Sequence, residues 1–289
     1  MLIPIMKLYE ISEQVQFNDL FQNPDMKETI ALCKEISKST PVNNEGKFRG
    51  FCSVCNKKVD FSYDWLYSYL EEKMINFREH LVCPICGLNN RQRGMAGIIL
   101  QNIDVKLKRK NIFFFEQVTP FYNTMINFIG DSHNIIGGEF LGYNISSGKF
   151  INGIRNENAL DLSFKADSLD MVISNDVFEH VPDINAALSE AHRVLSRGGK
   201  LIFSIPFLFT ETTKTRAKLV DGKIEFLEEA IYHGNPVSSE GSLVFYDFGW
   251  DIISMCKNVG FSSVNMLAYF SIGLGHLGYA PLFVFMAIK

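Results

Sequence analysis

The segment that decides the fold is DLSFKADSLDMVISNDVFEHVPDINAALSEAHRVLSRGGKLIFSIP, residues 161–206. It holds two short apolar runs, 171–174 and 199–205, which are typical of strands buried on both faces. Between them, over 183–197, apolar residues recur every three or four positions, as on the buried face of a helix. The segment therefore predicts a strand, a helix and a second strand, in that order.

The residues at each end of this helix support its limits. Asp183 follows Pro182, and an aspartate at that position can accept a hydrogen bond from the first turn. Gly198 and Gly199 are suited to end the helix. We therefore expect the helix to span 183–197.

The same alternation continues outside this segment. Apolar runs at 111–115 and 134–139 precede it, and runs at 264–270 and 282–288 follow it. Strands that alternate with helices predict right-handed βαβ units and one parallel, doubly wound sheet. The last two runs flank a glycine-rich loop and predict an antiparallel hairpin. The expected fold class is α/β, with a mostly parallel sheet and an antiparallel C-terminal hairpin.

The composition is that of a globular chain. Of 289 residues, 47% are apolar and 21% are charged, which excludes disordered and low-complexity architectures. The net charge of −4 argues against a general nucleic-acid binder. The uncharged stretch 267–288 has the length of a membrane span, but its glycines favour the hairpin. The first residues form no export signal, so we expect a cytoplasmic protein that is not bound to a membrane.

Four of the six cysteines form two pairs with two intervening residues each. The pairs are Cys52 with Cys55 and Cys83 with Cys86. Two such turns can place four thiolates around one Zn²⁺ in tetrahedral geometry. Four protein ligands leave no open coordination position, so this zinc would be structural. A redox dithiol pair and unconnected core cysteines are the alternatives.

These observations divide the chain into three expected regions. Residues 1–50 mix a weak helical pattern with a polar linker. Residues 51–100 hold the four cysteines, and residues 101–289 hold the alternating strands and helices.

Short motifs of the deciding segment occur in the same order in one enzyme family. They are L-x-F-x-x-x-S-x-D at 162–170, E-H-V at 179–181 and R-V-L-x-x-G-G at 193–199. The chain thereby resembles the class I S-adenosylmethionine-dependent methyltransferases, in the type 11-like branch, over about 110–289. With C-P-x-C-G at 83–87 and Y-H-G-N-P at 232–236, it resembles members that carry a zinc ribbon.

The resemblance implies S-adenosylmethionine as cofactor, bound beyond the carboxyl ends of the strands. Glu139 would hold the ribose hydroxyls, because a carboxylate can accept two hydroxyl hydrogen bonds. Glu116 would contact the amino group, and Asn158 would lie in the loop that contacts the adenine. The residues that the resemblance places at the cofactor are Glu116, Thr119, Glu139, Asn158, Ala159, Asn175 and Asp176.

The sequence departs from the family after the first strand. The family has an acidic residue followed by G-x-G-x-G, whereas residues 115–122 read FEQVTPFY without a glycine. Thr119 and Pro120 are suited to begin a helix there. The N–H groups of that helix could meet the carboxylate of the cofactor.

Two histidines are candidates for catalysis. Methyl transfer from a sulfonium needs no acid, but a hydroxyl acceptor must lose its proton to a base. His233, in a loop of the kind that contacts acceptors, and His180 are the candidate bases, against structural roles for both.

The leading functional hypothesis is O-methylation of a small-molecule or sugar-type acceptor. One alternative is an RNA methyltransferase, with Arg91, Arg93 and 106–110 as a basic patch, although the negative net charge disfavours nucleic acid. Another is a non-catalytic interaction protein on a degenerate methyltransferase fold.

Overall fold

The computed structural model describes residues 6–103 and 109–289. Its contacts divide the chain into two compact units. One unit comprises residues 1–104 and 266–284, and the other comprises residues 105–265 and 285–289. No helix within the described ranges is long and apolar enough to cross a membrane.

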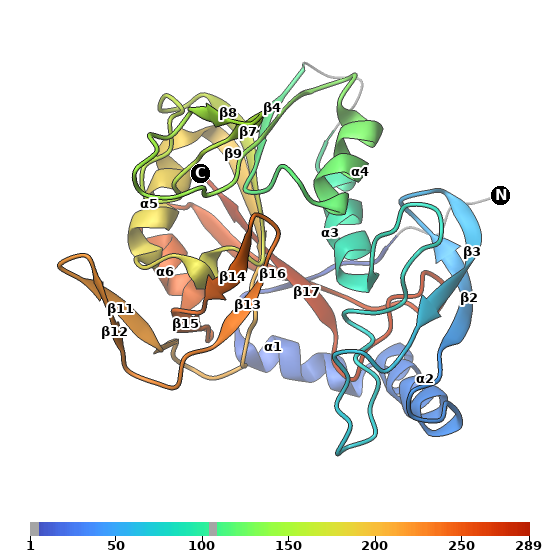
Figure 1. The fold of residues 1–289 in the computed structure, drawn as a ribbon. Coiled ribbons are helices and arrows are strands. Elements are labelled where there is room, and N and C mark those ends of the chain that lie inside the picture. Colours follow the sequence, from blue (N-terminus) through green and yellow to red (C-terminus); the bar gives the residue numbers. More distant parts are fainter. Residues whose placement is uncertain (1–5, 104–108) are drawn as a thin grey trace. The chain divides into compact units, whose positions relative to one another are not determined.

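The larger unit, residues 105–265 with 285–289, is built on a mostly parallel sheet (Figure 1). Strand β4 lies between β5 and β8, and β8 is followed by β9, all in parallel pairs. Strand β17 then pairs antiparallel with β9, with Phe285 opposite Phe203. This sheet and its antiparallel C-terminal strands confirm the predicted fold class. The strands are β4 (Asn111–Phe114), β5 (Asn134–Gly137), β8 (Leu169–Asn175), β9 (Leu195–Ser204), β16 (Ser263–Tyr269) and β17 (Leu282–Ile288).

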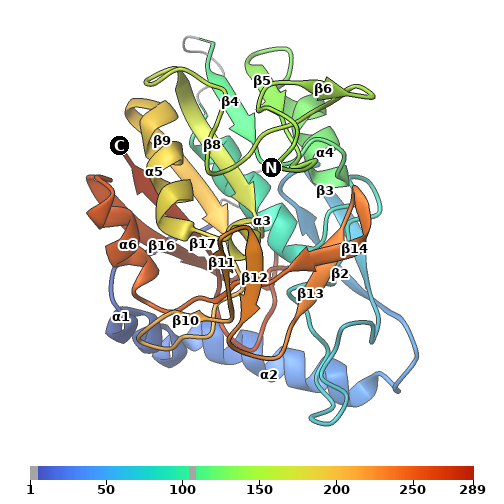
Figure 2. The same cartoon turned by 60° about the vertical axis from the view of Figure 1, so that its left-hand side comes forward.

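The order of these strands creates a switch point between β4 and β8. The chain passes from β4 outward to β5, and then returns to continue on the other side of β4 with β8 and β9 (Figure 2). Helix α4 (Pro120–Ile129) lies on one face of the sheet, and α5 (Ile184–Val194) and α6 (Ile252–Asn258) lie on the other (Figure 1). Ligands of doubly wound sheets bind at such a switch point, beyond the carboxyl ends of the strands.

Helix α5 begins as expected and ends early. The Asp183 side chain accepts from Ala186 N, which confirms the predicted cap. The helix stops at Val194, not at residue 197, because β9 begins at Leu195. Gly198 lies inside that strand at φ 76° and donates its N–H to Lys289 O. The glycine pair therefore accommodates an irregularity in a strand and does not end the helix.

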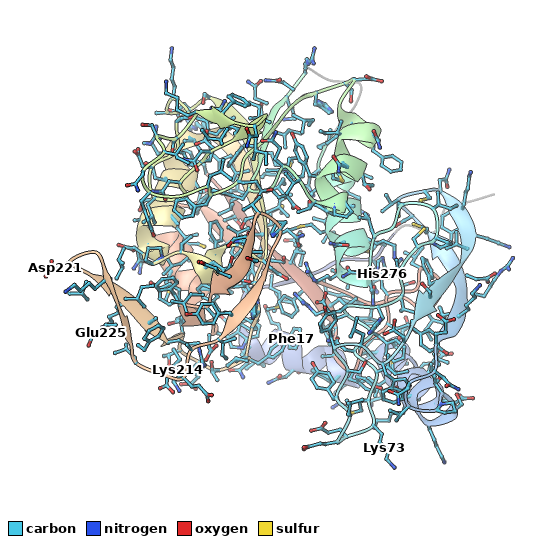
Figure 3. All side chains as sticks on the ribbon, viewed as in Figure 1. Phe17, Lys73, Lys214, Asp221, Glu225 and His276 are labelled. Carbon is cyan, nitrogen blue, oxygen red and sulfur yellow. The ribbon has the colours of Figure 1, made fainter. Side chains whose placement is uncertain are left out.

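Short hairpins are inserted between the larger elements of this unit. In the hairpin of β11 and β12, the turn residues Asp221 and Gly222 both have positive φ, as a two-residue turn between twisted strands requires. Figure 3 shows Asp221 and Glu225 along this hairpin. The remaining elements are β6 (Phe150–Ile151), β7 (Ile154–Arg155), η2 (Phe178–His180), β10 (Lys214–Thr215), β11 (Ala217–Val220), β12 (Lys223–Phe226), β13 (Tyr232–Asn235), β14 (Ser238–Leu243) and β15 (Tyr246–Asp247).

The smaller unit, residues 1–104 with 266–284, combines helices with a β-hairpin. Asn23 caps α2, and Asn89 and Gln92 form a reciprocal capping box at the start of α3. The Tyr9–Ile11 strand pairs antiparallel with Met266–Ala268 of β16. Its elements are β1 (Tyr9–Ile11), α1 (Gln14–Asp19), η1 (Leu20–Gln22), α2 (Pro24–Ser39), β2 (Gly46–Cys52), β3 (Lys57–Tyr63) and α3 (Asn90–Gln101).

Candidate active site and metal centre

Two acidic residues follow neighbouring strands of the larger unit. Glu116 comes after β4 and Glu139 after β5, and the two residues are only 6% and 8% exposed. Glu139 Oε1 accepts from the backbone N–H groups of Gln117 (2.6 Å) and Val118 (3.0 Å). The residue expected to hold the ribose thus also anchors the loop that follows β4.

The loop after β4 ends in the predicted helix start. Thr119 Oγ1 accepts from Tyr122 N at 3.1 Å, and Pro120 is the first residue of α4, as the sequence predicts. The Thr119 hydroxyl also donates to Glu116 Oε2. In this structure, Thr119 and Glu116 therefore stabilise the loop together.

Gln117 was not identified from the sequence. Its Nε2 donates to Gly153 O at 2.9 Å, and its Oε1 accepts from Arg155 N at 2.8 Å. The side chain therefore ties the glycine-free loop to the β6–β7 hairpin. No periodicity or motif marks such a contact, because the two segments are more than 30 residues apart in sequence.

The segment expected to contact the adenine is a tight turn. Asn158 Oδ1 accepts from Leu160 N at 3.0 Å, and Asn158 pairs with Asp161 in an isolated bridge. Ala159, between them, is buried. The preceding Glu157, also missed by the sequence analysis, is 2% exposed and pairs with Arg155 Nε at 2.7 Å.

Asn175 and Asp176 follow each other at the carboxyl end of β8. The Ser204 hydroxyl, at the end of β9, lies 3.1 Å from Asn175 Oδ1 and 2.6 Å from Asp176 Oδ1. Asp176 adopts a left-handed backbone with φ 52°. The structure therefore brings polar groups of β8 and β9 to the sheet edge where the switch point lies.

Both candidate catalytic histidines lie in one cluster with Glu179. His180 Nε2 is 3.6 Å from Glu179 Oε1, and His233 Nδ1 is 3.8 Å from the same oxygen. The two imidazole rings are 5.1 Å apart and perpendicular. Burial lowers the pKa of both histidines below the ordinary value. The E-H-V motif contains Glu179, but the sequence analysis assigned it no role. Its position directly before His180 could have indicated that it belongs to the same site.

The four paired cysteines of the smaller unit also come together. Cys52 Sγ is 3.9 Å from Cys86 Sγ, and Cys55 Sγ is 3.8 Å from Cys83 Sγ. Tetrahedral zinc with Zn–S bonds of about 2.3 Å requires sulfur separations of about 3.8 Å. Backbone N–H groups of Cys55 and Ile85 point at Cys52 Sγ and Cys83 Sγ, both at 3.5 Å. The predicted ligand set is therefore compatible with structural zinc.

One residue of the candidate basic patch does not lie on the surface. Arg93 is fully buried, and it donates to Leu274 O and Gly275 O at 2.8 Å each. Its guanidinium lies 3.9 Å from the centre of the Phe61 ring. Lysines 106 and 108 of the 106–110 run lie outside the described residues. Arg93 therefore holds the interior of its unit together and cannot contact RNA.

Residues 141–203 match the family model of a methyltransferase domain. This part of the chain belongs to a methyltransferase domain. The match includes the turn at Asn158, the carboxyl end of β8 and the whole of α5. Methyltransferases whose structures are similar to this one are described as S-adenosylmethionine-dependent.

Solved structures of methyltransferases are similar to this one at low identity. An S-adenosylmethionine-dependent methyltransferase from Mesorhizobium loti is 14% identical, with a TM-score of 0.42, over 68% of this chain and 98% of that chain. The 1,6-didemethyltoxoflavin-N1-methyltransferase of Burkholderia thailandensis is 13% identical, with a TM-score of 0.40, over 69% and 78%. No curated protein matches the sequence. At these values, the two similarities carry no argument about the acceptor.

Proposed function

We propose that the methyltransferase domain methylates a hydroxyl group of a small-molecule or sugar-type acceptor. The cluster of Glu179, His180 and His233 is the observation that carries this proposal. A hydroxyl acceptor must give up a proton when the new C–O bond forms, and imidazole is the side chain suited to accept it near neutral pH.

The chemistry of the strand ends fits the cofactor. S-adenosylmethionine supplies an electrophilic methyl group on a sulfonium, together with an amino group and two ribose hydroxyls. Glu116 is suited to the amino group. The second carboxylate oxygen of Glu139 is suited to a ribose hydroxyl, while Oε1 holds the loop. Thr119, Asn158, Ala159, Asn175 and Asp176 complete the proposed contacts.

The two histidines have different proposed tasks. His233 has the more exposed side chain, 40% against 17% for His180, and is therefore placed to meet an acceptor. His180 Nδ1 donates to Leu243 O at 2.9 Å, which fixes the orientation of its ring. We therefore assign contact with the acceptor to His233 and a positioning role to His180.

One observation favours a second function. The loop after β4 lacks glycines, and Glu139 and Gln117 hold it against its neighbours. A loop fixed in this way would suit a non-catalytic interaction protein. The two functions differ in whether the cofactor binds.

The first test is calorimetric titration of zinc-loaded protein with S-adenosylmethionine and S-adenosylhomocysteine. We expect both to bind at one site per chain. A well-folded sample that binds neither would refute the enzyme and favour the interaction protein.

The second test is transfer of labelled methyl groups to a panel of hydroxylated small molecules and to RNA. We expect methyl ethers of small molecules, and at least a tenfold loss of kcat for His233→Ala with unchanged cofactor affinity. The matched control is His192→Ala, which changes a histidine outside the cluster. Methylated RNA, or an unaffected His233→Ala variant, would contradict the proposal.

A further inference from the structure

We infer that Glu179, His180 and His233 form a second metal site, for one divalent first-row transition-metal ion. The inference rests on the proposed function only for the use of the ion in catalysis. The ion itself is argued from the positions of three side chains of the larger unit. Two imidazoles and one carboxylate are donors that zinc, manganese and iron share.

The distances within the cluster suit three ligands of a common ion. The donor atoms of the three residues all lie within 4.8 Å of one another. The two nitrogens lie 3.6 and 3.8 Å from Glu179 Oε1, which is too long for hydrogen bonds. Two ligands of a tetrahedral ion with bonds of about 2.1 Å are about 3.4 Å apart. The two carboxylate–imidazole distances are therefore within a few tenths of an ångström of the separation that a shared ion requires.

The hydrogen bond of His180 decides which atom faces the carboxylate. Leu243 O is a carbonyl oxygen and can only accept, so His180 Nδ1 is the donor at 2.9 Å. In the neutral ring, Nε2 then carries a lone pair, and that lone pair is on the side of Glu179 Oε1. Two acceptors that face each other require a cation or a proton between them. A second-shell carbonyl on the remote nitrogen is also the usual arrangement of a metal-binding histidine.

Burial strengthens the case for a cation. The Glu179 side chain is 0% exposed, and an ionised carboxylate in the interior is costly unless positive charge balances it. Divalent metal supplies that charge at short range. The side chain of His233 is 40% exposed, so the site opens toward solvent on one side. Water or an acceptor oxygen can therefore occupy the remaining coordination positions.

The backbone around the cluster holds the ligands in place. Phe245 N donates to Glu179 O at 2.7 Å, so the segment after β14 is bound directly to η2. His233 pairs with Ser242 across the β13–β14 hairpin, next to the Leu243 that orients His180. The same hairpin therefore carries one ligand and positions a second.

The ion would explain how a hydroxyl becomes nucleophilic here. An acceptor oxygen bound to the ion has a lowered pKa and releases its proton to water, so the histidines then act as ligands of the ion and not as the base. The oxygen then forms the new bond to the methyl carbon, and the bond from that carbon to the sulfonium sulfur breaks. No electron is gained or lost by the metal.

The experiment is a titration of zinc-loaded protein with Mn²⁺, with free Mn²⁺ measured by electron paramagnetic resonance. Zinc is added at one equivalent only, which the four thiolates take up, so the imidazole and carboxylate donors stay open to Mn²⁺. We expect one Mn²⁺ per chain, and affinity at least tenfold weaker in Glu179→Gln and His233→Ala. Because Glu179 is buried, the partly exposed His233 gives the variant that is safer for folding. His192→Ala is the control and should bind as the wild type does.

Two results would overturn the second metal site. One is a wild-type protein that binds no Mn²⁺ at millimolar concentration, and the other is a folded His233→Ala variant that binds Mn²⁺ as tightly as the wild type. Cofactor calorimetry on the same samples separates this inference from the proposed function. Bound Mn²⁺ without cofactor binding supports the site and refutes the enzyme. Methyl transfer by protein without a second metal refutes the site alone.

Discussion

The carboxylate of Glu139 holds the loop after β4 and is the proposed ligand of the ribose. Its Oε1 accepts two backbone hydrogen bonds from the loop after β4, at 2.6 and 3.0 Å. These bonds fix a backbone that could otherwise adopt several conformations. The side chain is therefore a determinant of the loop as well as a proposed ligand of the ribose.

We expect Glu139→Ala to abolish measurable cofactor binding. The substitution removes the proposed acceptor for the ribose hydroxyls and leaves two loop N–H groups without their carboxylate. Calorimetry with S-adenosylhomocysteine measures the effect, and Asp131→Asn, at an exposed carboxylate, is the control. Unchanged affinity in Glu139→Ala would show that the assignment to the second strand of the fold is wrong.

Among the helices and strands, local sequence patterns correctly predicted the elements that short-range interactions determine. The apolar periodicity and Asp183 identified α5, and the strands β16 and β17 lie where short apolar runs flank glycines. The end of α5 was misplaced because Gly198 bonds to Lys289, which is 91 residues away. The contact of Gln117 with the β6–β7 hairpin escaped prediction for the same reason. Long-range hydrogen bonds leave no periodic signal in a sequence.

Helix α5 contains an ion pair whose two residues also form hydrogen bonds with the loop before β8. Glu190 Oε2 accepts from Leu162 N at 2.8 Å, and Arg193 binds both Glu190 oxygens and the carbonyls of Leu162 and Phe164. The hydrogen bonds from Arg193 lower the pKa of Glu190. A carboxyl whose pKa is depressed by folding stabilises the protein above its unfolded pKa, and that contribution disappears as pH falls through the folded value.

We expect Glu190→Gln to reduce the free energy of unfolding by about 1 kcal/mol at pH 7, since Arg193 is partly exposed and solvent screens the pair. The difference from the wild type should shrink as the pH falls below 4. Urea denaturation at pH 7, 5 and 3.5 measures this, with the exposed Glu35→Gln as control. A difference of equal size at all three pH values would contradict the role of the charge.

At the scale of the whole molecule, the cysteine cluster joins the turn after β2 to the segment before α3. Burial raises the pKa of Cys55 to about 12, so zinc binding must displace its proton. The spacing of the cysteines was sufficient to predict all four zinc ligands, because a single turn places the two thiolates of each pair. The interior position of Arg93 could not be predicted, since it depends on carbonyls at Leu274 and Gly275.

We expect one structural zinc per chain, and loss of the folded smaller unit when a chelator removes it. Limited proteolysis should then cut between Cys52 and Cys86, where the native protein resists cleavage. Cys52→Ser should lose the zinc, whereas Cys256→Ser, at a buried cysteine of the other unit, should keep it. Metal-free protein that resists the protease as well as the zinc-loaded form would refute this role for zinc.

The contacts of the buried Arg93 also affect the order in which the protein can fold. Its two carbonyl partners belong to residues 266–284, which complete a unit whose other part lies before residue 105. On the ribosome, Arg93 emerges 181 residues before Leu274 and 182 residues before Gly275. Arg93 therefore lacks its buried partners while β4 to β16 are made. A chaperone or early zinc loading would protect that segment during the interval, and a fragment ending at residue 104 would remain incomplete.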